Sequence, residues 1–331
     1  MNKAATKTVE AVTKLLEEGK KLALAGDEEV LSKLPEGNWI GGTTPYFITE
    51  KDGGEFNKEK IYAEEIPEFA EDIKIKTYDE YNFDEISSNF YDNGFTLFII
   101  PAFSGIHEYF ALNNWKIKNL YKNPFVGWVS GFDLNTENAS AKVYNGLTGE
   151  ALTDKAVAIH VKLPDNKKAG VNIVNIFNQD KNADKIEFLN TGFEAEECLI
   201  NDKKVNFADY LSIKNIDTKL PLVADYSGIK INVSIKAVDT ENKKVHFYAP
   251  VFENRIYRTA EPIKDYTKEF KIKVPKLYNE PAFSCNCILN YLYGELENNK
   301  LSIGGPVTFG EIAYGLLNQT LVYMTVNDNE I

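Results

Sequence analysis

The 331-residue chain has few of the residues on which several large classes of protein depend. It contains only three cysteines, too few for the disulfide framework of a small secreted protein. Its longest apolar stretch, residues 95–103, is too short to cross a membrane. The first residues lack the apolar core that a signal peptide needs. These absences predict a cytoplasmic protein.

Positive charge is also scarce. The chain has 37 basic and 49 acidic residues, a net charge of −12, and only two of the basic residues are arginines. Such a chain repels phosphate backbones and anionic lipid surfaces, and no basic patch with interleaved aromatic residues offsets this. Neither common glycine-rich phosphate motif occurs, which disfavours nucleotide hydrolysis. We therefore expect no nucleic acid and no membrane among its partners.

Side chains that could hold a metal are few. The chain has three histidines besides its three cysteines, so a four-ligand zinc site would need two thirds of them to converge from distant segments. We expect no metal and no other cofactor. A haem-binding gas sensor stays open as an alternative, in which His107, on a predicted short helix, would be the axial ligand.

What the chain does have is the composition of a globular protein of about two domains, with 44% apolar and 26% charged residues. Apolar residues at helical spacing predict a helix that begins near Val9 and ends before Gly19. Asp27 is placed to cap a second, shorter helix. The pair Gly41–Gly42 predicts a tight turn between two strands, and residues 95–100 predict a buried strand.

Strands dominate after residue 125. In residues 157–163 apolar side chains alternate with others, which predicts a strand with His160 pointing away from its buried face. Residues 229–237 keep a period of two and are followed by a polar turn and a return strand from Val245, which predicts an antiparallel hairpin. The polar segment 213–221 lies between these regions and ends in a proline.

These patterns predict an α/β fold with an α+β tendency. We expect two lobes with mixed, largely antiparallel sheets and short flanking helices. The polar, proline-ended segment is the predicted boundary, so the lobes would be residues 1–212 and 213–331, each built on its own sheet.

Two neighbouring cysteines are the candidate nucleophiles. Cys285 and Cys287 lie on a predicted strand that leads into a helix, and a helix N-terminus can lower the pKa of a thiol. A buried structural thiol is the commoner fate of a cysteine. An enzyme that uses either cysteine as its nucleophile therefore stays open as an alternative.

Glu311 is the most conspicuous carboxylate of the sequence, because it directly follows Gly310 in an otherwise apolar neighbourhood. A carboxylate in such surroundings must be paired or must bind something. It can bond to the local backbone or pair with Arg258, or it can contact a ligand. The residues alone leave both possibilities open.

The C-terminal third resembles the C-terminal part of a FIST domain, a family proposed to sense small ligands in intracellular signalling. Its tail is the most specific part, since Gly310 and Glu311 follow an aromatic residue, and Asn318 and Thr320 start the last strand, as in FIST domains. The other similar segments are residues 245–262 and 283–290, and the glycine-rich turns at 39–44, 126–131 and 143–146. The likeness spans about residues 20 to 326.

The resemblance implies a stand-alone sensor with a ligand pocket between its two lobes, acting through a separate signalling partner protein. The ligand-binding residues that we expect are Phe309, Gly310, Glu311, Tyr314 and Asn318, together with Cys287 and Arg258. A carboxylate in the pocket favours a ligand with an ammonium group, so amino acids or amines are the first candidates.

The sequence departs from the FIST pattern at two places. Family members usually carry an arginine three residues after a cysteine in the strand-to-helix segment, where this chain has Asn290 after Cys287 and Ile288 after Cys285. The charged segment at residues 64–68, Glu-Glu-Ile-Pro-Glu, has no counterpart in the family. The missing arginine argues against a strongly anionic ligand.

Overall fold

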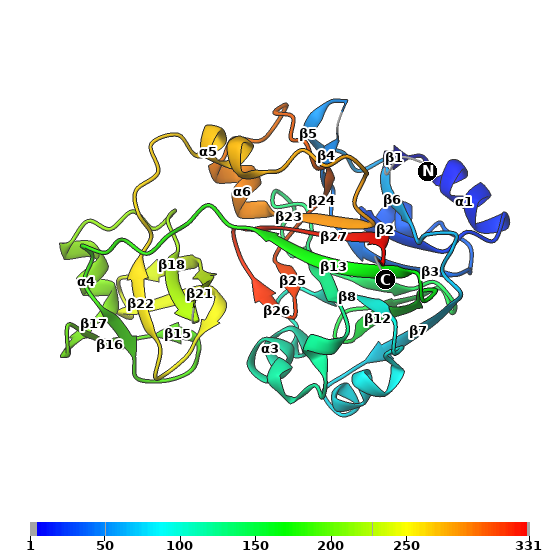
Figure 1. The fold of residues 1–331 in the computed structure, drawn as a ribbon. Coiled ribbons are helices and arrows are strands. Elements are labelled where there is room, and N and C mark those ends of the chain that lie inside the picture. The colour runs from blue at the N-terminus through cyan, green and yellow to red at the C-terminus, as the bar shows by residue number, and fades with distance from the viewer. Residues whose placement is uncertain (1–4, 50, 227, 330–331) are drawn as a thin grey trace. The chain divides into compact units, whose positions relative to one another are not determined.

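The computed structural model describes residues 5–49, 51–226 and 228–329, which belong to two compact units (Figure 1). Unit 1 is made of Met1–Val174, Val274–Leu316 and Leu321–Ile331, and unit 2 is made of Asn175–Lys273 and Leu317–Thr320. Unit 2 is therefore inserted into the chain of unit 1. The fold is mixed α/β, with mostly antiparallel sheets and short helices.

The first sheet of unit 1 carries two helices on one face. Apolar side chains of both helices, such as Val12 and Val30, form one buried cluster with Leu24 and Trp39 of the sheet. The sheet order is β1-β6-β2-β3-β10-β11, and only β2 and β3 are parallel among these pairs. Its elements are β1 (Ala5–Lys7), α1 (Val9–Glu17), β2 (Leu22–Gly26), α2 (Glu28–Leu31), β3 (Trp39–Thr43), β6 (Ile61–Glu65), β10 (Val143–Asn145) and β11 (Glu150–Leu152).

The second sheet of unit 1 has a largely apolar central strand. Its strand β8 (Gly94–Pro101) is buried along its whole length and runs parallel to β9 (Phe125–Ser130). Rings of Phe98, Phe110 and Phe125 pack together where α3 (Gly105–Asn113) covers this sheet. The order is β26-β25-β9-β8-β12-β7, and the other elements are β7 (Asp72–Tyr78), β12 (Ala156–Lys162), β25 (Glu311–Ala313), β26 (Gly315–Leu317) and the 3-10 turns η1 (Phe83–Asn89), η2 (Asn114–Lys116) and η3 (Leu120–Lys122).

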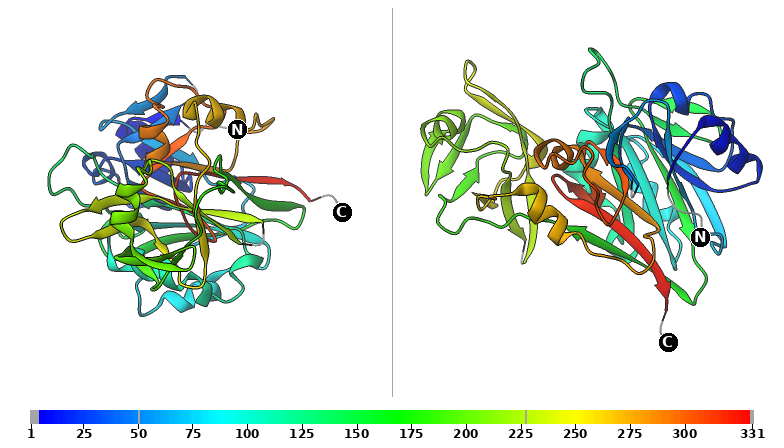
Figure 2. Two further views of the ribbon diagram at one scale, coloured as in Figure 1. Left: turned by 90° about the vertical axis from the view of Figure 1, so that its left-hand side faces the viewer. Right: turned by 90° about the horizontal axis from the view of Figure 1, so that it is seen from above.

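The third sheet joins segments from both ends of the chain. Its strands β13 (Lys167–Val174) and β27 (Leu321–Asp328) lie side by side along their length in Figures 1 and 2. The order is β13-β27-β23-β24-β4-β5. The remaining elements are β4 (Tyr46–Thr49), β5 (Gly53–Phe56), β23 (Phe283–Cys287), α6 (Ile288–Tyr293) and β24 (Gly305–Thr308).

Unit 2 has a six-stranded antiparallel sheet, β17-β16-β14-β22-β18-β19, and a three-stranded one, β15-β21-β20. Both contribute to one apolar core, in which the Phe188 ring lies 5.4 Å from Tyr257 and 5.5 Å from Phe247. The elements are β14 (Ile186–Phe188), β15 (Gly192–Ala195), β16 (Glu197–Ile200), β17 (Lys203–Asn206), α4 (Phe207–Ile213), β18 (Leu222–Tyr226), β19 (Ile229–Val233), β20 (Ile235–Asp239), β21 (Lys244–Val251), β22 (Ile256–Thr259) and α5 (Tyr266–Lys273).

Local signals predicted the first two helices correctly. Thr8 caps α1 and Asp27 caps α2, each by accepting a hydrogen bond from a backbone N–H of the first turn.

The glycine pair was interpreted wrongly as a turn, since Gly41 and Gly42 lie within β3. A Cβ on Gly42 would stand 2.7 Å from Ile99 Cγ2, so glycine is required there by close packing between two sheets.

Three further expectations differ from the structure. His160 is completely buried, because both faces of β12 are covered. The predicted hairpin exists as β20 and β21, but the nine-residue strand before its turn is interrupted at Ser234, and its first half, β19, pairs with β18 in the other sheet. The two units divide at residues 174/175, 273/274, 316/317 and 320/321. The segment 213–221 lies inside unit 2, where it connects α4 to β18.

None of the helices in the described part of the chain has the length and hydropathy that crossing a membrane requires.

Candidate functional site

Of the predicted ligand contacts, Glu311 and the two residues before it, Phe309 and Gly310, lie in the interior of unit 1. Glu311 starts β25 opposite Trp128 of β9 and is completely buried. Phe309 is also buried, with its ring 4.9 Å from that of Phe132. The carbonyl of Gly310 accepts a hydrogen bond from the Val129 N–H at 2.8 Å. This part of the predicted site is thus packed between strands.

The Cys285 thiol, which lies near Glu311, is held as a thiol. Cys287 is buried at the start of α6, and Cys285, also buried, donates to the Gly127 carbonyl at 3.4 Å. Burial raises the pKa of Cys285 well above its ordinary value, and the carboxyl groups of Glu311 and Glu64 act in the same direction. This geometry does not favour a thiolate nucleophile at Cys285.

The remaining predicted residues have different surroundings. Tyr314 has a left-handed backbone (φ 62°), and its ring lies 5.4 Å from that of Tyr121. Asn318 and Arg258 belong to unit 2. There the Asn318 carbonyl accepts from the Asn232 amide at 3.0 Å, and the Arg258 guanidinium donates to the Ala183 carbonyl. A shared pocket of Glu311, Asn318 and Arg258 stays a prediction.

His107, the candidate haem ligand, is buried on α3. Its Nδ1 accepts a hydrogen bond from the backbone N–H of Phe103 at 3.2 Å. Among residues 5–49, 51–226 and 228–329, no three histidine, cysteine, aspartate or glutamate side chains are grouped so that they could hold a metal ion.

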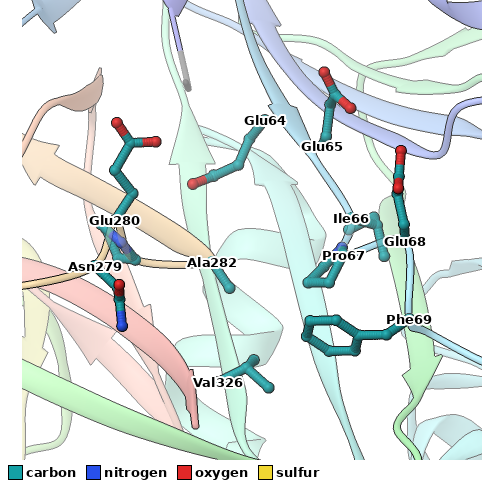
Figure 3. Close-up of a pocket in the computed structure, with 11 residues that line it drawn as sticks. Glu64, Glu65, Ile66, Pro67, Glu68, Phe69, Asn279, Glu280, Ala282 and Val326 are labelled. Atoms are coloured by element: carbon teal, nitrogen blue, oxygen red, sulfur yellow. The ribbon is translucent and has the colours of Figure 1, made fainter. Parts of the chain in front are cut away.

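Two adjoining cavities in unit 1 offer a different site, and Figure 3 shows the first of them. The first has a volume of about 390 Å³ and the second about 300 Å³. Both are walled by Glu64, at the end of β6, and by residues 279–281 of the segment that leads from α5 to β23. None of the residues predicted from the sequence as ligand contacts lines either cavity.

Glu64 has the most unusual environment at these cavities. The residue is 5% exposed, and within the described part of the chain its Oε1 has no hydrogen-bond partner. Burial raises the pKa of this carboxyl well above 4.5, and Glu280 raises it further, whereas a hydrogen bond from the Ser284 backbone lowers it. A buried polar atom without a partner costs free energy that a bound ligand can recover.

The charge around the first cavity is negative. Glu64, Glu65, Glu68 and Glu280 all line it, and among the described residues no lysine, arginine or histidine lines either cavity. Lys20 lies nearby and pairs with Glu68 and with Glu65, the latter at 3.6 Å. The two cavities therefore suit a cation and disfavour an anion.

The second cavity adds aromatic groups. It is lined by Tyr62, which stacks on Phe47, and by Tyr278, whose side chain is fully exposed to solvent. The face of a tyrosine ring attracts an organic ammonium group. This combination of a buried carboxyl and rings fits an organic cation better than a bare metal ion, which prefers several oxygen ligands.

The sequence did not reveal this site, although it contains one signal of it. The charged segment at residues 64–68 stood out because it has no counterpart in FIST domains. Nothing in the sequence showed that Glu64 would be buried, because its neighbours Ser284 and Glu280 are more than two hundred residues away along the chain.

Comparison with known proteins gives a family without an assigned role. The sequence pattern of a family of unknown function (DUF6976) matches residues 7–327, nearly the whole chain. No curated protein matches the chain.

Proposed function

The chain belongs to that family of unknown function (DUF6976), and we propose that it is a small-ligand-binding protein that takes an organic ammonium compound at the cavities beside Glu64. The observation that carries this proposal is the buried Glu64 carboxyl, which faces a cavity and leaves Oε1 without a partner among the described residues. An ammonium group would supply both the missing hydrogen-bond donor and the compensating charge.

The choice of Glu64 over Glu311 rests on access. Both carboxylates are buried, but Glu64 lines two cavities, whereas Glu311 lies within the strand pair β25–β9. Both also raise the pKa of Cys285, which lies near them in the interior of unit 1. The ammonium preference inferred for Glu311 is thus transferred to a carboxylate that a ligand can reach.

The biological role that we propose is sensing inside the cell, with the ligand-bound form recognised by a separate signalling protein. The resemblance to FIST domains supports this role. A cytoplasmic location fits the three cysteines, which are buried and form no disulfide among the described residues. An enzyme built on Cys285 has less support, because its thiol is buried and its pKa is raised.

Binding can be tested by thermal unfolding with a panel of amines. A ligand present at about 100 times its Kd adds about 2.7 kcal/mol of stability, which raises Tm by several degrees. We expect butylamine and larger amines to raise Tm at pH 8, and acetate, phosphate and hexanol to leave it unchanged. Glu64→Gln should abolish the shift.

Glu55→Gln is the matched control. Burial also raises the pKa of Glu55, but this residue lines neither cavity. The control should therefore keep the amine-induced shift. If no amine shifts the wild-type protein, or if Glu64→Gln folds and still responds, the proposed site is wrong.

A further inference from the structure

One part of the first cavity is walled by apolar side chains. Pro67 and Phe69 follow β6, Ala282 precedes β23 and Val326 belongs to β27, and all four line this cavity. Figure 3 shows them below Glu64 in this view, with the Phe69 ring turned toward Val326. We call these four side chains the apolar wall.

The apolar wall is partly open to water. Phe69 is 38% exposed, and Pro67, Ala282 and Val326 are half-buried. A ligand that covered these side chains would remove apolar surface from water, which can increase affinity up to about fourfold for each methylene group that is buried. The wall therefore favours a ligand with an apolar part.

The charges near the wall give such a ligand one orientation. Lys167 Nζ lies 5.2 Å from the centre of the Phe69 ring and 2.6 Å from Asp328 Oδ1. An ammonium group beside Phe69 would meet the Lys167 cation, which repels it. Beside Glu64 it would meet a carboxyl group whose Oε1 has no hydrogen-bond partner in the described part of the chain. The charged end of a ligand therefore fits at Glu64 and its apolar end at Phe69.

The other carboxylates of this cavity give little reason for a second ammonium group. Glu65 and Glu68 both pair with Lys20, and the hydrogen bond from Lys20 holds the pKa of Glu68 below its ordinary value. Glu64, with the charge of Glu280 acting on it, is then the place for a single ammonium group.

We propose that the ligand is a hydrophobic monoamine, with its ammonium group bonded to Glu64 and an alkyl or arylalkyl group against the apolar wall. This inference rests on the proposed amine-binding function and deepens it. It separates the two ligand classes that the sequence left open, because an amino acid would bring a carboxylate next to Glu64 and Glu280.

Isothermal titration calorimetry at pH 8 with matched compounds tests the inference. Hexylamine is butylamine lengthened by two methylene groups, and norleucine is pentylamine with an added carboxylate. We expect hexylamine to bind about tenfold more tightly than butylamine, which is about threefold for each methylene group. Norleucine should bind about tenfold more weakly than pentylamine, because its carboxylate is repelled by the cavity.

Two variants test the apolar wall. Phe69→Ala removes the ring, and Val326→Thr replaces a methyl group by a hydroxyl at nearly constant size. Each should reduce the preference for hexylamine over butylamine to about threefold. Phe56→Ala is the matched control, because Phe56 is 42% exposed but lines neither cavity, and it should keep the tenfold preference. Glu64→Gln should weaken both amines. Thermal unfolding without ligand checks that each variant is folded.

The outcomes separate this inference from the proposed function. If hexylamine binds no more tightly than butylamine, the inference is wrong and the amine site stands. The same holds if Phe69→Ala and Val326→Thr both keep the tenfold preference, if Phe56→Ala loses it to the same extent, or if norleucine binds as well as pentylamine. If none of the amines binds at millimolar concentration, the proposed function and the inference both fail.

Discussion

Two titratable side chains of unit 1, His160 on β12 and Glu64 on β6, are almost equally inaccessible to solvent but differ in their partners. His160 Nε2 lies 2.8 Å from the Tyr78 hydroxyl, and Nδ1 lies 3.0 Å from Thr96 Oγ1. Because Thr96 donates to Asn123, Thr96 Oγ1 can accept from Nδ1–H, and Nε2 accepts from Tyr78. A neutral imidazole satisfies this cluster completely. The Glu64 carboxyl, by contrast, has one oxygen without a partner among the described residues.

This difference in hydrogen-bond partners distinguishes a buried side chain with a structural role from a buried side chain that is suited to bind a ligand. A satisfied cluster rigidifies the interior and gains nothing from a further partner. A buried oxygen that faces a cavity costs stability until something binds. His160 should therefore matter for folding and Glu64 for binding, and each of the following predictions tests that division.

The largest effect that we expect is the loss of stability in His160→Ala. The substitution leaves a cavity in the interior and deprives Tyr78 and Thr96 of their shared partner. We expect the free energy of unfolding to fall by about 3 kcal/mol. Urea unfolding at pH 7.5 measures this change. A loss below about 1 kcal/mol would contradict the structural role assigned to His160.

The pH dependence of stability gives the next largest effect. Burial, together with Lys74 and Lys76, lowers the pKa of His160 to about 3, from 6.5. Between these values the unfolded chain binds a proton that the folded chain does not, so stability falls as the pH decreases below 6.5. The loss is about 2 kcal/mol between pH 6.5 and 5.

His160→Gln isolates that contribution, because the other titrating groups are unchanged. Denaturant unfolding of the variant at pH 5, 6 and 7.5 should show a shallower decline than that of the wild-type protein. Parallel pH profiles for the two proteins would mean that His160 is protonated as readily in the folded chain as in the unfolded one.

Features of the fold that depend on near neighbours in the chain could be predicted from the sequence. α1, α2 and the β20–β21 hairpin were predicted because a capping side chain or a polar turn lies within a few residues of the element that it shapes. Alternation of side chains showed the strands around Ser234 but not that they belong to different sheets. The insertion of unit 2 was missed for a similar reason, because pairing of β13 with β27 joins residues about 150 positions apart.

The site depends still more on distant contacts. Glu64 shares its cavities with residues 279–281 and accepts a hydrogen bond from the Ser284 backbone, and the charged segment 64–68 gives no sign of these distant neighbours. His160 was expected on an exposed face because alternation cannot show that a second layer covers that face. The preference for an ammonium ligand, which was expected from a carboxylate at Glu311, stays a prediction, and the sequence did not indicate the location at Glu64 that we propose for it.

Glu64→Gln should have a smaller effect of the opposite sign. Because the pKa of Glu64 is raised in the folded protein, the Glu64 carboxyl of the unfolded chain loses its proton at a lower pH than that of the folded chain. The stability that the neutral carboxyl contributes is therefore present below pH 4.5 and is lost as the pH rises through the pKa of Glu64 in the folded protein. Glutamine stays neutral, and we expect the variant to be about 1 kcal/mol more stable than the wild-type protein at pH 8.

Unfolding at pH 4.5 and pH 8 checks this sign, since the advantage of Glu64→Gln should grow between the two values. A variant that is less stable at pH 8 would show that the Glu64 charge is satisfied in the folded protein. The contrast with His160 would then break down.

The smallest effect concerns Tyr278, which lines the second cavity with a fully exposed ring. Tyr278→Ala removes no buried surface, so the free energy of unfolding should stay within about 0.5 kcal/mol of the wild-type value. A ring over an exposed ammonium group contributes about 0.5 to 1 kcal/mol, so the affinity for butylamine should fall about threefold. Tyr278→Phe keeps the ring face and should bind as the wild-type protein does. If Tyr278→Ala binds butylamine as well as the wild-type protein does, the ammonium group lies in the first cavity and Glu64 alone determines the affinity. If Tyr278→Phe also binds threefold more weakly, the ligand contacts the hydroxyl and not the ring.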